Sequence, residues 1–114
     1  MSKLAELIAK MEGFGKSDSI PTLRNNPGDL RHSPHASHDG IGQDAIGIID
    51  TTEHGWEDLE RQLKLYAERG MTVAECIAAY APTVENDTGN YLRFVCDGLG
   101  LPPETIMAEA LEVV

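Results

Sequence analysis

The chain has 114 residues, which corresponds to one domain (1–114) with its own hydrophobic core. Its formal net charge of -10 argues against nucleic acid and anionic membranes as main partners, because phosphate binding needs clustered Lys and Arg. No apolar run approaches the roughly 20 residues of a membrane span. The acids Glu6 and Glu12 near the N-terminus are inconsistent with a secretory signal peptide, so we expect synthesis in the cytoplasm without membrane insertion.

The N-terminal segment has the pattern of an amphipathic helix over residues 2–13. Apolar residues recur at helical spacing from Leu4 to Met11, and the glycines at 13 and 15 end the helix. Residues 15–45 then carry many turn-forming residues, which predicts loops with one short extended piece near residues 30–31. The apolar, β-branched segment 45–49 predicts a strand.

Four further helices are expected in the rest of the chain. The second covers about 53–69, and Thr72 and Glu75 form a capping box that opens the third. The third helix stops before Pro82, and the last two cover about 88–97 and 103–112. The predicted class is therefore α+β and mostly α, with about five helices and a small β/loop region after the first helix.

Glu12 is the side chain that fits its helix face least well. It follows Ile8 by four residues and Leu4 by eight, so it lies at the edge of the apolar stripe. A carboxyl group at such an edge loses part of its hydration and keeps its proton nearer to neutral pH. A general acid that cleaves glycosidic bonds needs this property. The alternative is a solvated Glu at the end of the helix.

Four segments resemble phage-encoded and g-type lysozyme-like enzymes, a superfamily related to soluble lytic transglycosylases. They are residues 8–14 (IAKMEGF), 24–30 (RNNPGDL), 46–56 (IGIIDTTEHGW) and 80–91 (YAPTVENDTGNY), and they occur in the order found in that superfamily. The resemblance implies a compact lysozyme-like fold with Glu12 as the catalytic acid.

The activity implied by this resemblance is cleavage of the β-1,4 bond between N-acetylmuramic acid and N-acetylglucosamine. The leading interpretation is an endolysin-like lysozyme, and one alternative is a lytic transglycosylase that leaves 1,6-anhydro products. A catalytically inert virion or cell-wall-binding protein is the other alternative. The partner would be the glycan strand of peptidoglycan, with the protein a monomer. It would be released from the host cytoplasm to the periplasm or cell wall, or be carried in the virion.

A second catalytic acid has two candidates, Asp18 and Asp29. Both lie in the loop region that follows Glu12, and both are also residue types that form turns. The superfamily turn generally has Asn at the position of Asp29, so this chain departs from the pattern there. A lytic transglycosylase needs no second acid, because the acetamido group of the sugar acts in its place.

Substrate-binding residues are expected across a cleft between the first helix, the loop region and the later helices. Asn25 and Asn26 either hydrogen-bond an N-acetyl group or form the turn before the Pro-Gly pair, and both interpretations stay open. By the resemblance, Tyr80 is expected to stack on a sugar ring and Asn86 to contact the substrate.

No metal or cofactor is expected. The histidines at 32, 35 and 38 are separated by a proline and belong to no predicted helix, which favours a solvated loop over a zinc site. Cys76 and Cys96 are expected to be reduced thiols rather than a disulfide. Four acids of the second helix are expected on a solvated face: Glu53, Glu57, Asp58 and Glu60.

Overall fold

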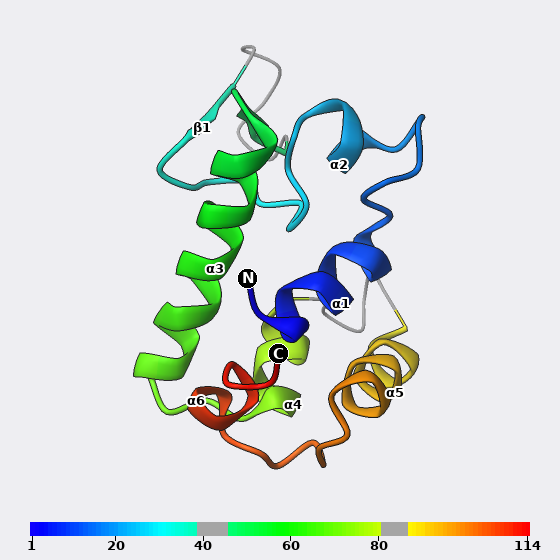
Figure 1. The fold of residues 1–114 in the computed structure, drawn as a ribbon, viewed down its shortest axis with the longest axis vertical. Coiled ribbons are helices and arrows are strands. Elements are labelled where there is room, and N and C mark those ends of the chain that lie inside the picture. Colours follow the sequence, from blue (N-terminus) through cyan, green and yellow to red (C-terminus); the bar gives the residue numbers. More distant parts are fainter. Residues whose placement is uncertain (39–45, 81–86) are drawn as a thin grey trace. The chain divides into compact units, whose positions relative to one another are not determined.

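The computed structural model describes residues 1–38, 46–80 and 87–114. In this part of the chain it contains six helices and one two-stranded sheet (Figure 1). Their bounds are α1 Lys3–Glu12, α2 Ile20–Leu23, β1 Ala36–Ser37, β2 Ile48–Ile49, α3 Thr52–Glu68, α4 Val73–Tyr80, α5 Thr88–Leu99 and α6 Met107–Ala110. The predicted class, α+β and mostly α, is confirmed.

Among the described helices, none has the length and apolar character that crossing a membrane requires. The chain divides into two compact units, one made of Met1–Leu7 with Gln62–Val114 and the other of Ile8–Arg61. Helices α1 and α3 each begin in one of these units and end in the other.

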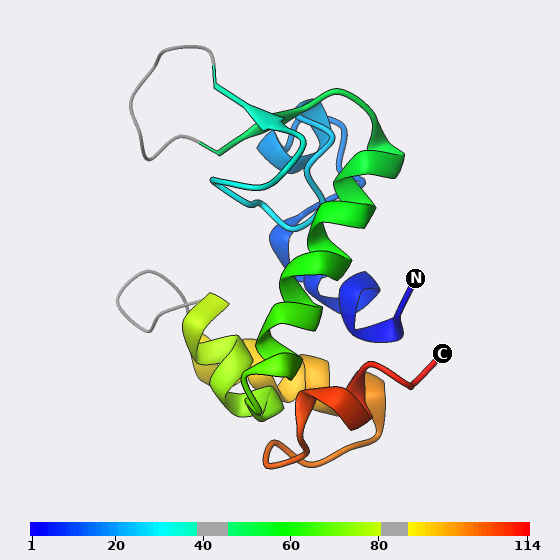
Figure 2. The same ribbon diagram turned by 90° about the vertical axis from the view of Figure 1, so that its left-hand side faces the viewer.

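The first unit (Met1–Leu7 with Gln62–Val114) is built on α4, α5 and α6. Figure 2 shows α4 and α5 next to each other, and they are in contact. The predicted capping box is confirmed, since Thr72 N donates to Glu75 Oε1 at 3.0 Å and Glu75 N donates to Thr72 Oγ1 at 3.1 Å. Helix α5 extends two residues beyond the predicted end near residue 97 and terminates at Gly100, with φ +70°.

The last helix is shorter than the predicted 103–112. Backbone groups on either side of Ile106 pair with the chain around the start of α4. Val73 N, in the first residue of α4, donates to Thr105 O, and Met107 N donates to Met71 O, both at 2.8 Å. Residues engaged in this bridge are extended, so α6 begins only at Met107.

The two cysteines, both in the first unit, are free thiols, as expected. Cys76 is fully buried, and burial raises the pKa of its thiol to about 12. Cys76 is therefore an unreactive core residue at neutral pH.

The second unit (Ile8–Arg61) contains a short helix that the sequence did not predict. Pro21 was interpreted as a loop residue but lies in the first turn of α2. The backbone N–H that proline lacks would have no partner within the helix at this position, so no hydrogen bond is lost. Ser19 caps this helix. The short extended piece expected near residues 30–31 lies further along the chain, at β1, which pairs antiparallel with β2 so that Ala36 lies opposite Ile49. Leu30 is not part of this sheet. Its backbone N–H and C=O are both hydrogen-bonded to the side chain of Asn26 in the preceding turn.

Candidate functional site

Two carboxyl groups of the second unit, those of Glu12 and Asp29, are hydrogen-bonded to each other. Glu12 is the last residue of α1, and Gly13, with φ +91°, turns the chain out of the helix immediately after it. Asp29 closes the turn of residues 26–29, with its N–H donating to Asn26 O at 3.0 Å. Both side chains are half-buried. Of the two candidate partners for Glu12, Asp29 is thus the one with an observed contact.

The environment of Asp29 favours its protonated form. Burial raises the pKa of this carboxyl group, and the hydrogen bond with Glu12 and the charge of Arg31 oppose that rise only in part. Among the described residues, no group pairs with the buried Oδ1 of Asp29. Two carboxylates at hydrogen-bonding distance repel each other unless one holds a proton, so the contact favours the form of the pair that carries one proton.

Asn26 has a structural role in the turn that carries Asp29. Its side chain is 0% exposed, and its Nδ2 donates to Leu30 O at 2.7 Å and to Gly47 O at 2.9 Å. Its Oδ1 accepts from Leu30 N at 2.9 Å. Because the Nδ2 and Oδ1 atoms of Asn26 are both hydrogen-bonded within the protein and the side chain is buried, the structure favours the turn-forming interpretation over sugar binding.

Asn25 connects the same turn to β2 and α3. It has φ +53°, a left-handed conformation that Asn tolerates better than most residues. Its Nδ2 donates to Ile49 O at 3.0 Å, and its Oδ1 accepts from Thr52 Oγ1 at 3.3 Å. Asn25 is half-buried and its amide is likewise used within the protein. Both asparagines therefore position the chain that leads to Asp29.

Gly55 allows α3 to approach this turn closely. A Cβ atom at Gly55 would lie 2.1 Å from Asn25 O and 2.8 Å from Pro27 Cδ. One residue further along α3, Trp56 packs edge to face against Phe14, with ring centroids 5.4 Å apart. Trp56 is half-buried. This aromatic pair therefore joins a residue two positions after Glu12 to the part of α3 that contacts the turn.

The other predicted site residues are not part of this carboxyl pair. Asp18 is exposed in the turn that precedes α2. Tyr80 is the half-buried last residue of α4 and belongs to the first unit. Asn86 lies outside the described residues.

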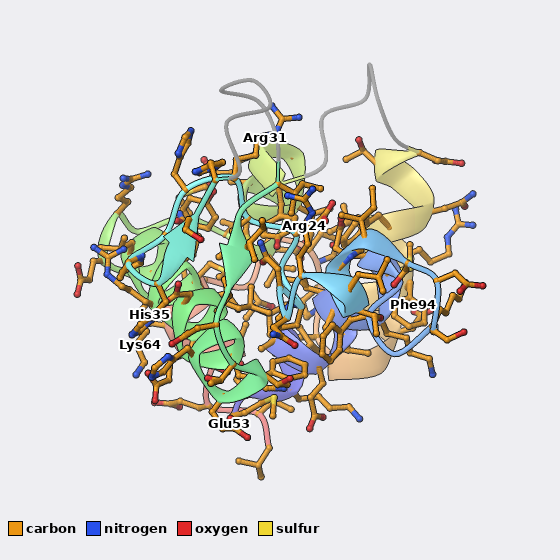
Figure 3. The ribbon with its side chains drawn as sticks, turned by 90° about the horizontal axis from the view of Figure 1, so that it is seen from above. Arg24, Arg31, His35, Glu53, Lys64 and Phe94 are labelled. Atoms are coloured by element: carbon orange, nitrogen blue, oxygen red, sulfur yellow. The ribbon has the colours of Figure 1, made fainter. Side chains whose placement is uncertain are left out.

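A second polar cluster in the same unit centres on Asp58. This residue was expected on a solvated face, but it is 2% exposed, which corrects that prediction. Its Oδ1 is 2.6 Å from His35 Nδ1, and its Oδ2 accepts from Ser33 Oγ at 2.6 Å and from His35 N at 2.9 Å. Burial alone would raise the pKa of Asp58, but these hydrogen bonds outweigh it and the pKa is lowered. His35 lies beside α3 in Figure 3.

His54 stacks on His35, with ring centroids 3.9 Å apart and planes inclined by 10°. Its Nδ1 is 2.7 Å from Asp50 Oδ1, and this hydrogen bond raises the pKa of His54 and lowers that of Asp50. In the sequence, His35 belongs to a run with His32 and His38, and its pairing with His54 was not predicted. The available signal was the spacing of His54 and Glu57, which places both on one face of the predicted helix.

Comparisons of the chain with protein-family models, with curated proteins and with solved structures gave no match.

Proposed function

We propose that the protein is a peptidoglycan-cleaving glycosidase in which Glu12 is the general acid. The observation that carries this proposal is the hydrogen bond between the carboxyl groups of Glu12 and Asp29. Such a bond needs a proton on one of the two groups, and a general acid must hold a proton at the pH at which it works. The resemblance of residues 8–14 to the acid-bearing segment of lysozyme-like enzymes supports the same residue. A lysozyme-like fold is part of the proposal.

The contact between the two carboxyl groups favours one mechanism. When a glycosidase uses two carboxylates, these flank the scissile bond about 5–5.5 Å or 6.5–9.5 Å apart. Glu12 and Asp29 are within hydrogen-bonding distance, which leaves no room between them for a sugar ring or a water molecule. We therefore assign Asp29 as a positioning residue that supports the proton of Glu12, and not as a nucleophile or a base.

Cleavage with a single acid then follows the course of a lytic transglycosylase. Glu12 transfers its proton to the glycosidic oxygen as the bond from C1 to that oxygen breaks, and the acetamido oxygen of the same sugar stabilises C1. The C6 hydroxyl group then forms a bond to C1 and returns its proton to Glu12. The products are a 1,6-anhydro sugar and a new free 4-hydroxyl group, and no water is consumed.

The test is an assay of the purified protein on insoluble peptidoglycan of several chemotypes, with mass spectrometry of the soluble fragments. We expect clearing of the suspension and fragments with 1,6-anhydro ends. Reducing ends would show hydrolysis by a lysozyme and contradict the mechanism while preserving the class of enzyme. If no chemotype is cleaved but sedimentation shows wall binding, the protein is an inert cell-wall-binding protein and the proposal fails.

Asp29→Asn tests the role of the second carboxyl group. Asn accepts the left-handed conformation of Asp29 (φ +53°), so the turn is preserved. Its amide group donates a hydrogen bond to Glu12, which favours the ionised form of that residue. We expect the alkaline limit of activity to move to lower pH while activity at acidic pH is retained. A pH profile of cleavage measures this, and an unchanged profile would show that Asp29 does not act on Glu12.

The same variant has a predicted effect on stability. A raised pKa means that the folded protein holds the Asp29 proton more tightly than the unfolded chain, so wild type loses stability as pH rises from 3.8 through the folded pKa. Asp29→Asn removes this loss. Thermal unfolding should show a higher Tm for the variant at pH 7, with the difference vanishing below pH 3.8. A variant that is less stable at pH 7 would contradict the assigned burial effect.

A further inference from the structure

His35, His54 and Glu57 bring three metal-binding side chains together on the second unit. One ligand atom from each lies within 4.8 Å of the others. His35 comes from the segment that leads into β1, whereas His54 and Glu57 are three residues apart on α3 and share a helix face. The cluster therefore joins two segments that are distant in sequence.

The hydrogen bonds around the two imidazoles select one ring nitrogen for metal binding. Nδ1 of His35 faces the carboxylate of Asp58, and Nδ1 of His54 faces that of Asp50. A carboxylate accepts hydrogen bonds, so in the neutral imidazoles Nδ1 carries the proton and Nε2 has the free electron pair. A carboxylate that orients a histidine in this way is the usual outer partner of a metal-binding histidine.

The outer partner of His35 is itself held in place. Asp58 is buried, and Ser33 Oγ and His35 N both donate to its Oδ2. Asp50, the outer partner of His54, is held more loosely because it is exposed, although Thr51 N donates to its Oδ1 at 3.0 Å. His35 is consequently the better oriented of the two imidazoles.

We propose that His35 Nε2, His54 Nε2 and a carboxylate oxygen of Glu57 bind a divalent transition-metal ion, for which Zn²⁺ is the expected choice. Two imidazoles and one carboxylate suit Zn²⁺ and its neighbours better than Mg²⁺ or Ca²⁺, which prefer oxygen ligands. Three protein ligands leave a fourth tetrahedral position for water or a ligand. This site is separate from the carboxyl pair of Glu12 and Asp29 and does not depend on it.

Binding requires a small rearrangement of exposed groups. Zn–N and Zn–O bonds of about 2.0–2.2 Å bring the ligand atoms closer together than they are in the stacked arrangement. His35 and Glu57 are exposed and His54 is half-buried, so we expect rotation of these side chains to bring the ligand atoms to bonding distance of the ion. The bound ion would tie the segment before β1 to α3.

The test uses the full chain, freed of metal with a chelator, and titration with ZnCl₂ followed by calorimetry. We expect one ion per chain and a rise in Tm on binding. Co²⁺ in place of Zn²⁺ should give the visible absorption of a four-coordinate site. His54→Ala and Glu57→Gln should each weaken binding by about 100-fold or more, because even loss of an outer partner typically weakens binding by about 10- to 100-fold. Asp50→Asn should weaken it by about 10-fold.

His32→Ala is the matched control, because His32 belongs to the same histidine run and its ring lies 5.3 Å from that of His38. This variant should bind Zn²⁺ like wild type. Glu57 is exposed, so Glu57→Gln should keep the fold even if a histidine variant does not, and circular dichroism verifies this. Absence of binding, equal binding by wild type and Glu57→Gln, or loss of binding only in His32→Ala would each overturn the proposal.

Discussion

Glu12→Gln is expected to lower the rate of peptidoglycan cleavage by about 100- to 10,000-fold, the usual contribution of a general acid. The amide has nearly the shape of the carboxyl group and still reaches Asp29 with a hydrogen bond, so the fold should be unchanged. It has no acidic proton to give to the leaving oxygen. The measurement is the initial rate of turbidity loss with purified peptidoglycan, with circular dichroism of both proteins.

Glu6→Gln is the matched control for this substitution. Glu6 lies on the same helix, α1, but it is exposed. The same chemical change at Glu6 should leave the rate within about twofold of wild type, since surface substitutions have small effects. Comparable losses at Glu6 and Glu12 would indicate a general effect of charge on wall binding. Full activity of Glu12→Gln would remove Glu12 from the mechanism.

Gly55→Ala is expected to lower the free energy of unfolding by about 3 kcal/mol, the upper part of the range for overpacking. The added Cβ would meet Asn25 O at 2.1 Å and Pro27 Cδ at 2.8 Å. These atoms belong to backbone and to a rigid ring, so relief requires α3 to move away from the turn. Because that turn carries Asp29, we also expect activity to fall. Urea unfolding measures the first effect and the turbidity assay the second.

Gly89→Ala is the control for Gly55→Ala. Gly89 also lies in the first turn of a helix, α5, but an added Cβ would meet nothing closer than Asp87 Oδ1 at 3.7 Å. Alanine favours helix over glycine by up to about 1 kcal/mol, so this variant should be as stable as wild type or slightly more stable. Equal stability of the two alanine variants would show that the close approach at Gly55 is relaxed in solution.

Local signals in the sequence predicted most helices well. The expected helices 2–13 and 53–69 correspond to α1 (Lys3–Glu12) and α3 (Thr52–Glu68). Such helices depend on periodicity and caps, which lie within a few residues of each other. The short α2 and the shortened α6 were missed because a proline at a helix start and a backbone bridge to a distant segment leave little local pattern.

The sequence by itself pointed to Glu12 as the candidate acid, through its position at the edge of an apolar stripe and through the resemblance of residues 8–14 to the acid-bearing segment of lysozyme-like enzymes. Both signals lie within one helix and its end. Only the tertiary structure decided that Asp29, and not Asp18, contacts Glu12, and that Asp58 is buried beside His35. It also paired His35 with His54, which no local spacing connects. These contacts depend on the path of the loops between helices. That path is set by buried hydrogen bonds such as those of Asn26, whose partners lie up to 21 residues away.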